Sequence, residues 1–467
     1  MANFTPIRNT ITHFMTSISV ASVLQSVVIF SFIFAMSHFS CETEYAEYRR
    51  IFYVIDFSTA ISLFGLGTLL LRKPLKCLYS DIVPTVFIIN LIQLVTVLVL
   101  LIIQSLPIIK YIEIVSFVFL NTLYQLCVTV LVMTNSRRLY FTCTASCFVL
   151  TILSLIYFVH SDSLTYRASY MLRVGVLFVY IIPFCLFVGK RLLRIKFPSW
   201  GKIYSLFKEA APIGFGVILG SCTQYIDKFI ASMLDSHQLA VYANASADIP
   251  FVGTAITTMS VFFVPIIHSF FSKNDYKNAC SSLSELFLFG WYIGVAVFTL
   301  LFCNAEFVVD VLYSSRYSES VILFRIFCLA YLFRIVSYTQ IIVALEIESI
   351  IIKRMVVEMI LQVVLSFVLL KIFGIVGLAA SVILVLSLWS VPYNVVNFKK
   401  KLSCQLTEIL PVKKMLIFFI KAFTPCMAIV VVMRYLSNNQ FLIFVVSVLA
   451  YLIVNYKENL YIIKKTR

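Results

Sequence analysis

The sequence predicts an all-α integral membrane protein with about fourteen transmembrane helices. Two observations predict this class. The residues are 61% apolar and 12% charged with a mean hydropathy of +1.00, whereas a soluble domain is roughly half apolar and a quarter charged. Runs of about twenty apolar residues, the length that a helix needs to cross the hydrocarbon layer, recur along the whole chain.

The expected spans follow one another with short connections, as read from hydropathy over a window of about nineteen residues. They lie at 11–39, 50–71, 81–106, 109–133, 139–160, 168–190, 208–234, 241–270, 281–303, 320–345, 352–372, 374–398, 412–435 and 439–457. The apolar run from Ile11 is too long for a cleaved signal peptide, so we expect it to remain as the first span. Gly374 and Gly377 predict a very short turn between spans eleven and twelve.

The basic residues predict the orientation of the spans. With the N-terminus inside, the even-numbered connections hold most of the Lys and Arg, including Lys399, Lys400 and Lys401. The odd-numbered connections hold few Lys and Arg residues, and acids such as Glu42 and Glu44 offset the positive charge there. We therefore expect both termini in the cytoplasm. The net charge of +16 is explained by these short loops, so nucleic acid is not an expected partner.

The longest inside connection predicts the domain organisation. Residues 191–207 follow six spans and contain Pro198 and Gly201, which are typical of a linker. The expected parts are a six-helix lobe at 1–190, this cytoplasmic linker, a second six-helix lobe at 208–400, and two further helices with a basic tail at 401–467.

The sequence leaves little room for catalysis. The longest expected connection is about seventeen residues, and the GxxxxGK[ST], HExxH and GxSxG motifs are absent from the sequence. Most of the twelve cysteines lie in apolar runs without a CxxC pair, which favours packing over a disulfide framework or a metal site. We expect a transporter rather than an enzyme, with no cofactor or bound metal, driven by an H⁺ or Na⁺ gradient or by the gradient of its substrate.

Ionisable residues inside the spans are the candidate site residues, because a charge at a helix centre costs about 2.5–3.5 kcal/mol on insertion scales. Arg334 is the first candidate, since it lies near the middle of span ten and shares a face with Tyr331 and Tyr338. We expect these three residues to line the substrate cavity. Arg325, nine residues earlier, points to the opposite side and either lines the cavity or reaches the lipid headgroups.

Four further charges predict a gate at the outer side. Adjacent residues on a helix do not face each other, so Lys228 and Asp227 of span seven should pair elsewhere. Asp56 in span two and Asp248 in span eight are the expected partners of Lys228. Such pairs would either close an outer gate between the lobes or fix the packing within one lobe.

Arg173 in span six shares a stripe with Tyr166, Tyr170 and Tyr180. This pattern of a cation among aromatic residues predicts either a belt at the membrane interface or a platform for a sugar.

Three segments carry a family resemblance. They are Glu44–Tyr48 with the helix that ends at Leu63–Gly67; Pro212 followed by Tyr225–Ile230 and Val241–Ala245; and Ile372–Ala380. In this order they resemble the polysaccharide transporter family of the MOP (MATE/MviN-like) superfamily, and most closely its Wzx-type flippases of O-antigen and capsule repeat units. The commonest members have twelve helices, whereas this chain resembles the related lipid II flippases in having two more.

The resemblance implies two six-helix lobes around a central cavity. It also implies that an undecaprenyl-diphosphate-linked oligosaccharide crosses the bacterial inner membrane by alternating access, as in lipopolysaccharide synthesis. Arg334 and Lys228 would then contact the diphosphate, with nearby tyrosines stacking on sugars. A polysaccharide polymerase and a chain-length regulator are the partner proteins implied.

Two other functions are alternatives. A cation-coupled multidrug exporter of the same superfamily would line its cavity with acids, whereas the buried charges here are more basic than acidic. A membrane-embedded polysaccharide polymerase would carry one long external loop with paired arginines, and the expected loops are too short for that.

Overall fold

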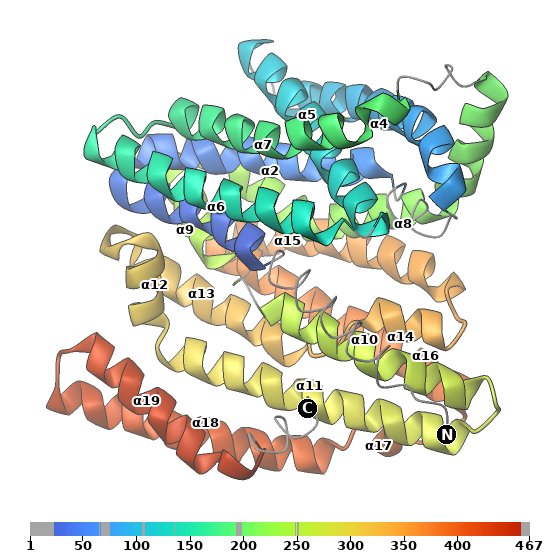
Figure 1. The fold of residues 1–467 in the computed structure, drawn as a ribbon. Coiled ribbons are helices and arrows are strands. Elements are labelled where there is room, and N and C mark those ends of the chain that lie inside the picture. The colour runs from blue at the N-terminus through green and yellow to red at the C-terminus, as the bar shows by residue number, and fades with distance from the viewer. Residues whose placement is uncertain are drawn as a thin grey trace. The chain divides into compact units, whose positions relative to one another are not determined.

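In the part of the chain that the computed structural model describes, every regular secondary-structure element is a helix (Figure 1). The structure describes residues 23–64, 66, 75–104, 108–134, 136–192, 199–247, 249 and 252–458. No strand occurs among these residues, so the all-α class is confirmed. Six of the described helices are long and apolar enough to cross a membrane, and the bent pair Trp200–Ala211 and Ile213–Ser232 would make a seventh. The total of fourteen spans stays a prediction, and residues 11–22 of the first span lie outside the described residues.

The chain divides into two compact units, Met1–Leu239 and Ala240–Arg467. The first unit contains the helix Val23–Phe39, α2 (Glu42–Leu63), α4 (Leu75–Gln104), α5 (Ile108–Met133), α6 (Arg137–His160), α7 (Tyr166–Leu192), α8 (Trp200–Ser232) and the start of α9 (Ser236–Ala245). Among these, α8 packs against α2 and α4 and is therefore grouped with the first unit. The lobe boundaries expected at 190 and 208 stay a prediction, and residues 193–198 of the linker lie outside the described residues.

Helix α2 is the central helix of the first unit, because it packs against α4, α5, α7 and α8. Most of its side chains are buried, although it carries Arg49, Arg50 and Asp56. Buried charges are costly unless they find partners. The side chains that interact with Arg49 and Asp56 lie inside the first unit and contribute to its polar interior.

The second unit is assembled around α11 (Tyr276–Cys303), which packs against α10, α13, α16, α17, α18 and α19. Its other elements are α10 (Val252–Phe271), α12 (Ala305–Tyr313), η1 (Ser315–Tyr317), α13 (Ser320–Cys328), η2 (Leu329–Leu332), α14 (Tyr338–Ala344), α15 (Ser349–Val385), η3 (Leu386–Ser390), α16 (Val391–Leu402), α17 (Leu406–Ile409), α18 (Val412–Leu436) and α19 (Gln440–Val454). The last two helices lie side by side along α11 (Figure 1).

The turn expected between spans eleven and twelve is present inside α15. The backbone breaks at Gly374, whose φ of 62° and ψ of −149° are not helical. Only glycine takes up such a conformation without strain. A Cβ on Gly377 would lie 2.0 Å from the Leu369 carbonyl oxygen, so the chain after the break passes close to the chain before it.

The expected continuous helix at 320–345 was wrong. Helix α13 ends at Cys328, the 3₁₀ turn η2 ends at Leu332, and α14 begins only at Tyr338. Arg334 therefore lies in a non-helical break rather than at the middle of a helix. Helical periodicity predicted a shared face for Tyr331, Arg334 and Tyr338, and the break removes the basis for that face.

The break is stabilised by close packing on α11. A Cβ on Gly290 would lie 2.0 Å from the Ile335 carbonyl oxygen, and one on Gly294 would lie 2.5 Å from the Tyr331 carbonyl oxygen. Two small residues four apart thus let backbone approach backbone, as at the interfaces of membrane helices. Backbone groups left free by an unwound segment need other partners inside a membrane protein.

Side chains supply two of those partners. The Tyr338 hydroxyl donates to the Phe333 carbonyl oxygen at 2.9 Å, and the Ser337 N–H donates to the Ser260 hydroxyl oxygen at 2.9 Å. The break is therefore a packed and hydrogen-bonded feature of the second unit.

Replacing Gly290 with alanine should destabilise the second unit. The added methyl group would overlap the Ile335 carbonyl, and overpacking of this kind costs about 1–3 kcal/mol. We expect a lower midpoint of thermal unfolding in detergent. Gly253→Ala is the control, because nothing lies within 4 Å of a Cβ at that position. Equal midpoints for the two variants would contradict the close packing.

Candidate functional site

A polar cavity lies inside the first unit and has a volume of about 140 Å³. The helix Val23–Phe39, α2, α5, α6 and α7 all contribute to its wall. Its polar side chains are Gln25, Asp56, Asn121, Gln125, Thr144 and Arg173, with the phenol rings of Tyr124 and Tyr180 beside them. Pockets for drug-sized ligands measure roughly 300–1,000 Å³. This cavity therefore suits one small polar group, such as a single sugar ring or a phosphate.

Arg173 of α7 is the cation of the cavity. Its guanidinium carbon lies 3.7 Å from the centre of the Phe52 ring and 5.5 Å from that of Phe117, and its Nη1 donates to the Tyr48 hydroxyl at 3.3 Å. Guanidinium has five N–H donors, so this one bond leaves donors for a ligand. Aromatic rings and polar side chains thus surround Arg173, and the choice between an interfacial belt and a sugar platform stays a prediction.

Asp56 of α2 lines the same cavity, and the positive charges that act on its carboxylate are those of Arg173 and Arg49. Arg49 is only 6% exposed, and its Nη2 donates to the Tyr53 hydroxyl at 3.0 Å. Residues 49, 53 and 56 share one face of a helix at spacings of four and three. Arg49 was not among the predicted site residues because the predicted span begins at residue 50, although the same spacing identifies it.

The expected pair between Asp56 and Lys228 is not formed in this structure. Lys228 Nζ donates to the Gln224 carbonyl oxygen at 2.9 Å and lies 3.9 Å from Asp227 Oδ1. The long lysine stem can fold back along its own helix, so the rule that adjacent residues avoid each other does not hold here. Asp227 itself is 3% exposed. Asp248 lies outside the described residues.

A second charged cluster joins α2 to the end of α8 and the start of α9. Arg50 donates to the carbonyl oxygens of Ser232 at 3.1 Å and Leu234 at 3.5 Å, where a cation meets the negative end of a helix. His237 Nδ1 lies 2.7 Å from Glu42 Oε1. These contacts fasten α2 to α8 at one end.

In the second unit, the candidate residues fall into separate places. Arg334 is exposed within its break, and its charge acts on the Glu358 carboxylate of α15. Tyr338 uses its hydroxyl to bond the break itself. Arg325 Nη2 lies 3.2 Å from Glu306 Oε1, while Arg434 lies 3.0 Å from the other oxygen of that carboxylate. Arg325 thus has a structural partner within its own unit.

Arg354 and Glu358 lie one helical turn apart on α15 and are part of a buried network. Arg354 is 8% exposed, and its Nε lies 3.5 Å from Glu358 Oε2. Its Nη1 donates to Asn394 Oδ1 at 3.2 Å, and the Ser390 hydroxyl donates to Glu358 at 3.2 Å. Ser390 belongs to the π-turn η3, and such turns are frequent at functional sites.

Comparison with solved structures decides the fold. No protein-family model and no curated protein matches the sequence. The lipid II flippase MurJ in an inward closed conformation is similar, with a TM-score of 0.69 and 13% identity over 96% of this chain and 99% of that chain. An inward-facing multidrug resistance MATE transporter of the MOP superfamily has a TM-score of 0.63 and 10% identity over 83% and 98%.

The chain has the fold of the MOP-superfamily transporters. A further structure with this fold is a MOP superfamily transporter from Pyrococcus furiosus, described as having a binding pocket of reverse polarity. Its TM-score is 0.54 at 10% identity, over 84% of this chain and 95% of that chain. These similar structures are of transporters and flippases, not of enzymes. The MOP fold and the apolar helices make this a multi-pass membrane protein.

Proposed function

We propose that this protein is a flippase that moves an undecaprenyl-diphosphate-linked O-antigen or capsule repeat unit across the bacterial inner membrane by alternating access. The observation that carries the proposal is the extent of the fold match. Agreement with a lipid II flippase extends over 96% of the chain, whereas agreement with the multidrug transporter extends over 83% of it. A lipid-linked substrate is therefore favoured over a free drug.

The polar cavity of the first unit supports this substrate class. A guanidinium backed by aromatic rings can bind a phosphate through two parallel hydrogen bonds. The amides of Asn121 and Gln125 offer both donors and acceptors, as sugar hydroxyls require. The polyprenyl tail can stay in lipid, so only the polar head needs such a lining. Arg173 becomes the first candidate for the diphosphate, and Arg334 and Lys228 remain candidates.

Asp56 gives the cavity a means of coupling to H⁺. While the carboxylate is charged, it balances Arg173 and competes with an incoming anion. Protonation of Asp56 removes the competing negative charge, so the diphosphate can then bind to Arg173. Binding of the substrate and binding of a proton would then favour each other.

The contacts that Arg50 and His237 make with their partners are the proposed closure of the outer side of the transporter. The predicted orientation places the start of α2 and the end of α8 on the outer side, and the predicted lobes assign these helices to different halves. Opening to that side requires Arg50 to leave the carbonyls of Ser232 and Leu234. Under this proposal, the contacts of Arg50 hold the outer side closed.

Reconstitution tests the proposed function. Full-length protein in proteoliposomes should expose a labelled undecaprenyl-diphosphate oligosaccharide to an enzyme added outside, faster than empty liposomes do. In cells, deletion of the gene should remove surface polysaccharide, and overexpression should leave drug resistance unchanged. Drug resistance without flipping would favour the multidrug exporter and overturn the proposal.

A further inference from the structure

Three potential metal ligands come together at the first turns of α11 in the second unit. Cys280 lies in α11, and Cys404 and Glu408 lie in the connection from α16 through α17. The two Sγ atoms and a carboxylate oxygen of Glu408 all lie within 4.8 Å of one another. The two cysteines are far apart in the sequence, so no spacing motif reveals them.

Packing and turn geometry hold the three residues in place. Helix α16 ends at Leu402, and Ser403 reverses the chain with a φ of 51°. Leu402 and Ile409 then pack in the same apolar cluster as Cys280, with Cys404 at its edge. The connection between α16 and α18 is thereby pinned against α11.

The carboxylate is oriented before any ligand arrives. Glu408 Oε2 accepts the Gln405 N–H at 2.9 Å as part of a capping box. This bond restricts the rotation of the side chain. The second carboxylate oxygen stays available, and a preorganised ligand loses less entropy on binding.

We propose that Cys280, Cys404 and Glu408 form a binding site for Zn²⁺ or another thiophilic divalent ion of similar size. Thiolate and carboxylate are both ligands of zinc, and a tetrahedral ion with Zn–S bonds of about 2.3 Å separates two sulfur atoms by about 3.8 Å. The three ligand atoms already lie within 4.8 Å of one another, so the side chains need to move only slightly to bind the ion. Three protein ligands leave the fourth position for water.

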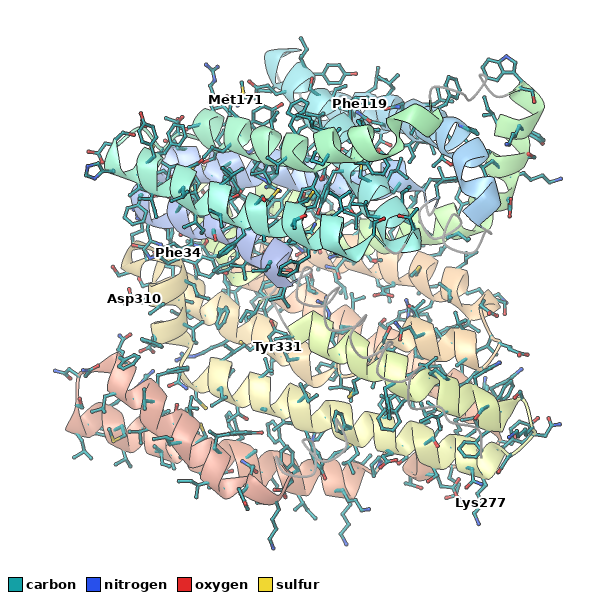
Figure 2. The ribbon with its side chains drawn as sticks, in the orientation of Figure 1. Phe34, Phe119, Met171, Lys277, Asp310 and Tyr331 are labelled. Carbon is teal, nitrogen blue, oxygen red and sulfur yellow. The ribbon has the colours of Figure 1, made fainter. Side chains whose placement is uncertain are left out.

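The surroundings suit entry from one side. Cys280 is buried, Cys404 is half-buried and Glu408 is exposed, so the ion would enter past the carboxylate and meet the buried thiolate last. Lys277 lies at the same end of α11 as Cys280. Figure 2 shows Asp310 of α12 at the opposite end of the second unit. The ion would tie α11 to the connection between α16 and α18. The site is independent of the proposed transport function.

The chain contains a matched pair of thiols that should not bind the ion. Cys303 of α11 and Cys426 of α18 also interact with each other, but both are at most 2% exposed and lie in an apolar cluster. Among the described residues, the group of Cys280, Cys404 and Glu408 is the one that combines three potential ligands. Cys426→Ser is therefore a control for the general effect of removing a buried thiol.

Cobalt titration tests the site. Reduced, metal-free, full-length protein in detergent is titrated with Co²⁺ and then with Zn²⁺. We expect a sulfur-to-cobalt charge-transfer band and the strong visible bands of tetrahedral Co²⁺, both removed by Zn²⁺. Zn²⁺ should raise the midpoint of thermal unfolding, and EDTA should reverse this, because an ion that binds only the folded chain stabilises it.

The variants make the test decisive. Cys280→Ser and Cys404→Ser should lose the charge-transfer band, and Glu408→Gln should bind Co²⁺ about tenfold or more weakly, as losses in a coordination sphere do. Cys426→Ser should keep both signals. Circular dichroism and gel filtration identify any variant that fails to fold, and the exposed Glu408 provides a variant that leaves the core intact. A wild-type protein without the band, or a folded Cys280→Ser variant that keeps it, would overturn the proposal.

Discussion

Replacing Arg173 with alanine is expected to abolish flipping of the lipid-linked repeat unit while the protein still inserts and folds. The guanidinium is the cation in the polar cavity of the first unit, and its removal leaves the diphosphate without a charge partner inside a low-dielectric wall. Losing a hydrogen-bonded charge partner of this kind costs about 2–5 kcal/mol, or roughly thirtyfold or more in transport rate. Arg173→Lys should keep part of the activity, because lysine carries the charge but not the planar fork.

The measurement is the initial rate in the proteoliposome assay, normalised to the amount of inserted protein. Arg167→Ala is the matched control, because Arg167 lies on the same helix and is exposed. A normal rate for folded Arg173→Ala would remove Arg173 from the site. Loss of drug transport in Asp56→Asn together with full drug transport in Arg173→Ala would instead indicate a cation-coupled exporter.

Replacing Arg354 with alanine is expected to be the most destabilising of the substitutions considered in the second unit. Arg354 is 8% exposed and contacts Glu358 and Asn394, so its loss removes the ion-pair partner of a buried carboxylate and the hydrogen-bond donor of a buried amide oxygen. Breaking a buried ion pair by removing one member costs about 3–5 kcal/mol. We expect a strongly lowered midpoint of thermal unfolding and less protein in the membrane.

Two further variants separate a lost charge partner from lost packing. Lys353→Ala removes the exposed neighbouring cation and should leave the midpoint unchanged. The double variant Arg354→Met and Glu358→Leu removes both charges and should recover much of the stability, since apolar residues can replace a buried pair at little cost. If Arg354→Ala unfolds at the same temperature as Lys353→Ala, the network does not stabilise the unit.

The contrast between Arg354 and Arg334 illustrates which features could be predicted. Arg354 and Glu358 lie four residues apart on one continuous helix, so local geometry alone pairs them. Arg334 was assigned to a helix face by the same geometry, but the helix is broken there. The break depends on the approach of the Ile335 and Tyr331 carbonyls to Gly290 and Gly294, which lie in another helix. No local pattern around Arg334 contains that information.

The cavity of the first unit shows the same limit. Hydropathy placed Asp56 and Arg173 inside spans, and their cost in lipid marked them as candidates. Which charges share a site was decided by the rotation of α2 and α7, which places Asp56 and Arg173 in the wall of one cavity, whereas Lys228 folds back along its own helix. The cluster of Cys280, Cys404 and Glu408 likewise depends on a chain reversal at Ser403.

Local sequence patterns predicted the all-α membrane class, the tight turn inside α15, and the ionisable residues that are costly to bury. Each of those properties depends on residues that are close together in the sequence, so it can be predicted from a local stretch of the chain. Tertiary structure decided where span ten is broken, which charges pair, and which polar side chains share a cavity. Contacts of that kind depend on how closely two backbones approach and on which face each helix turns to its neighbour, and residues distant in the sequence set both.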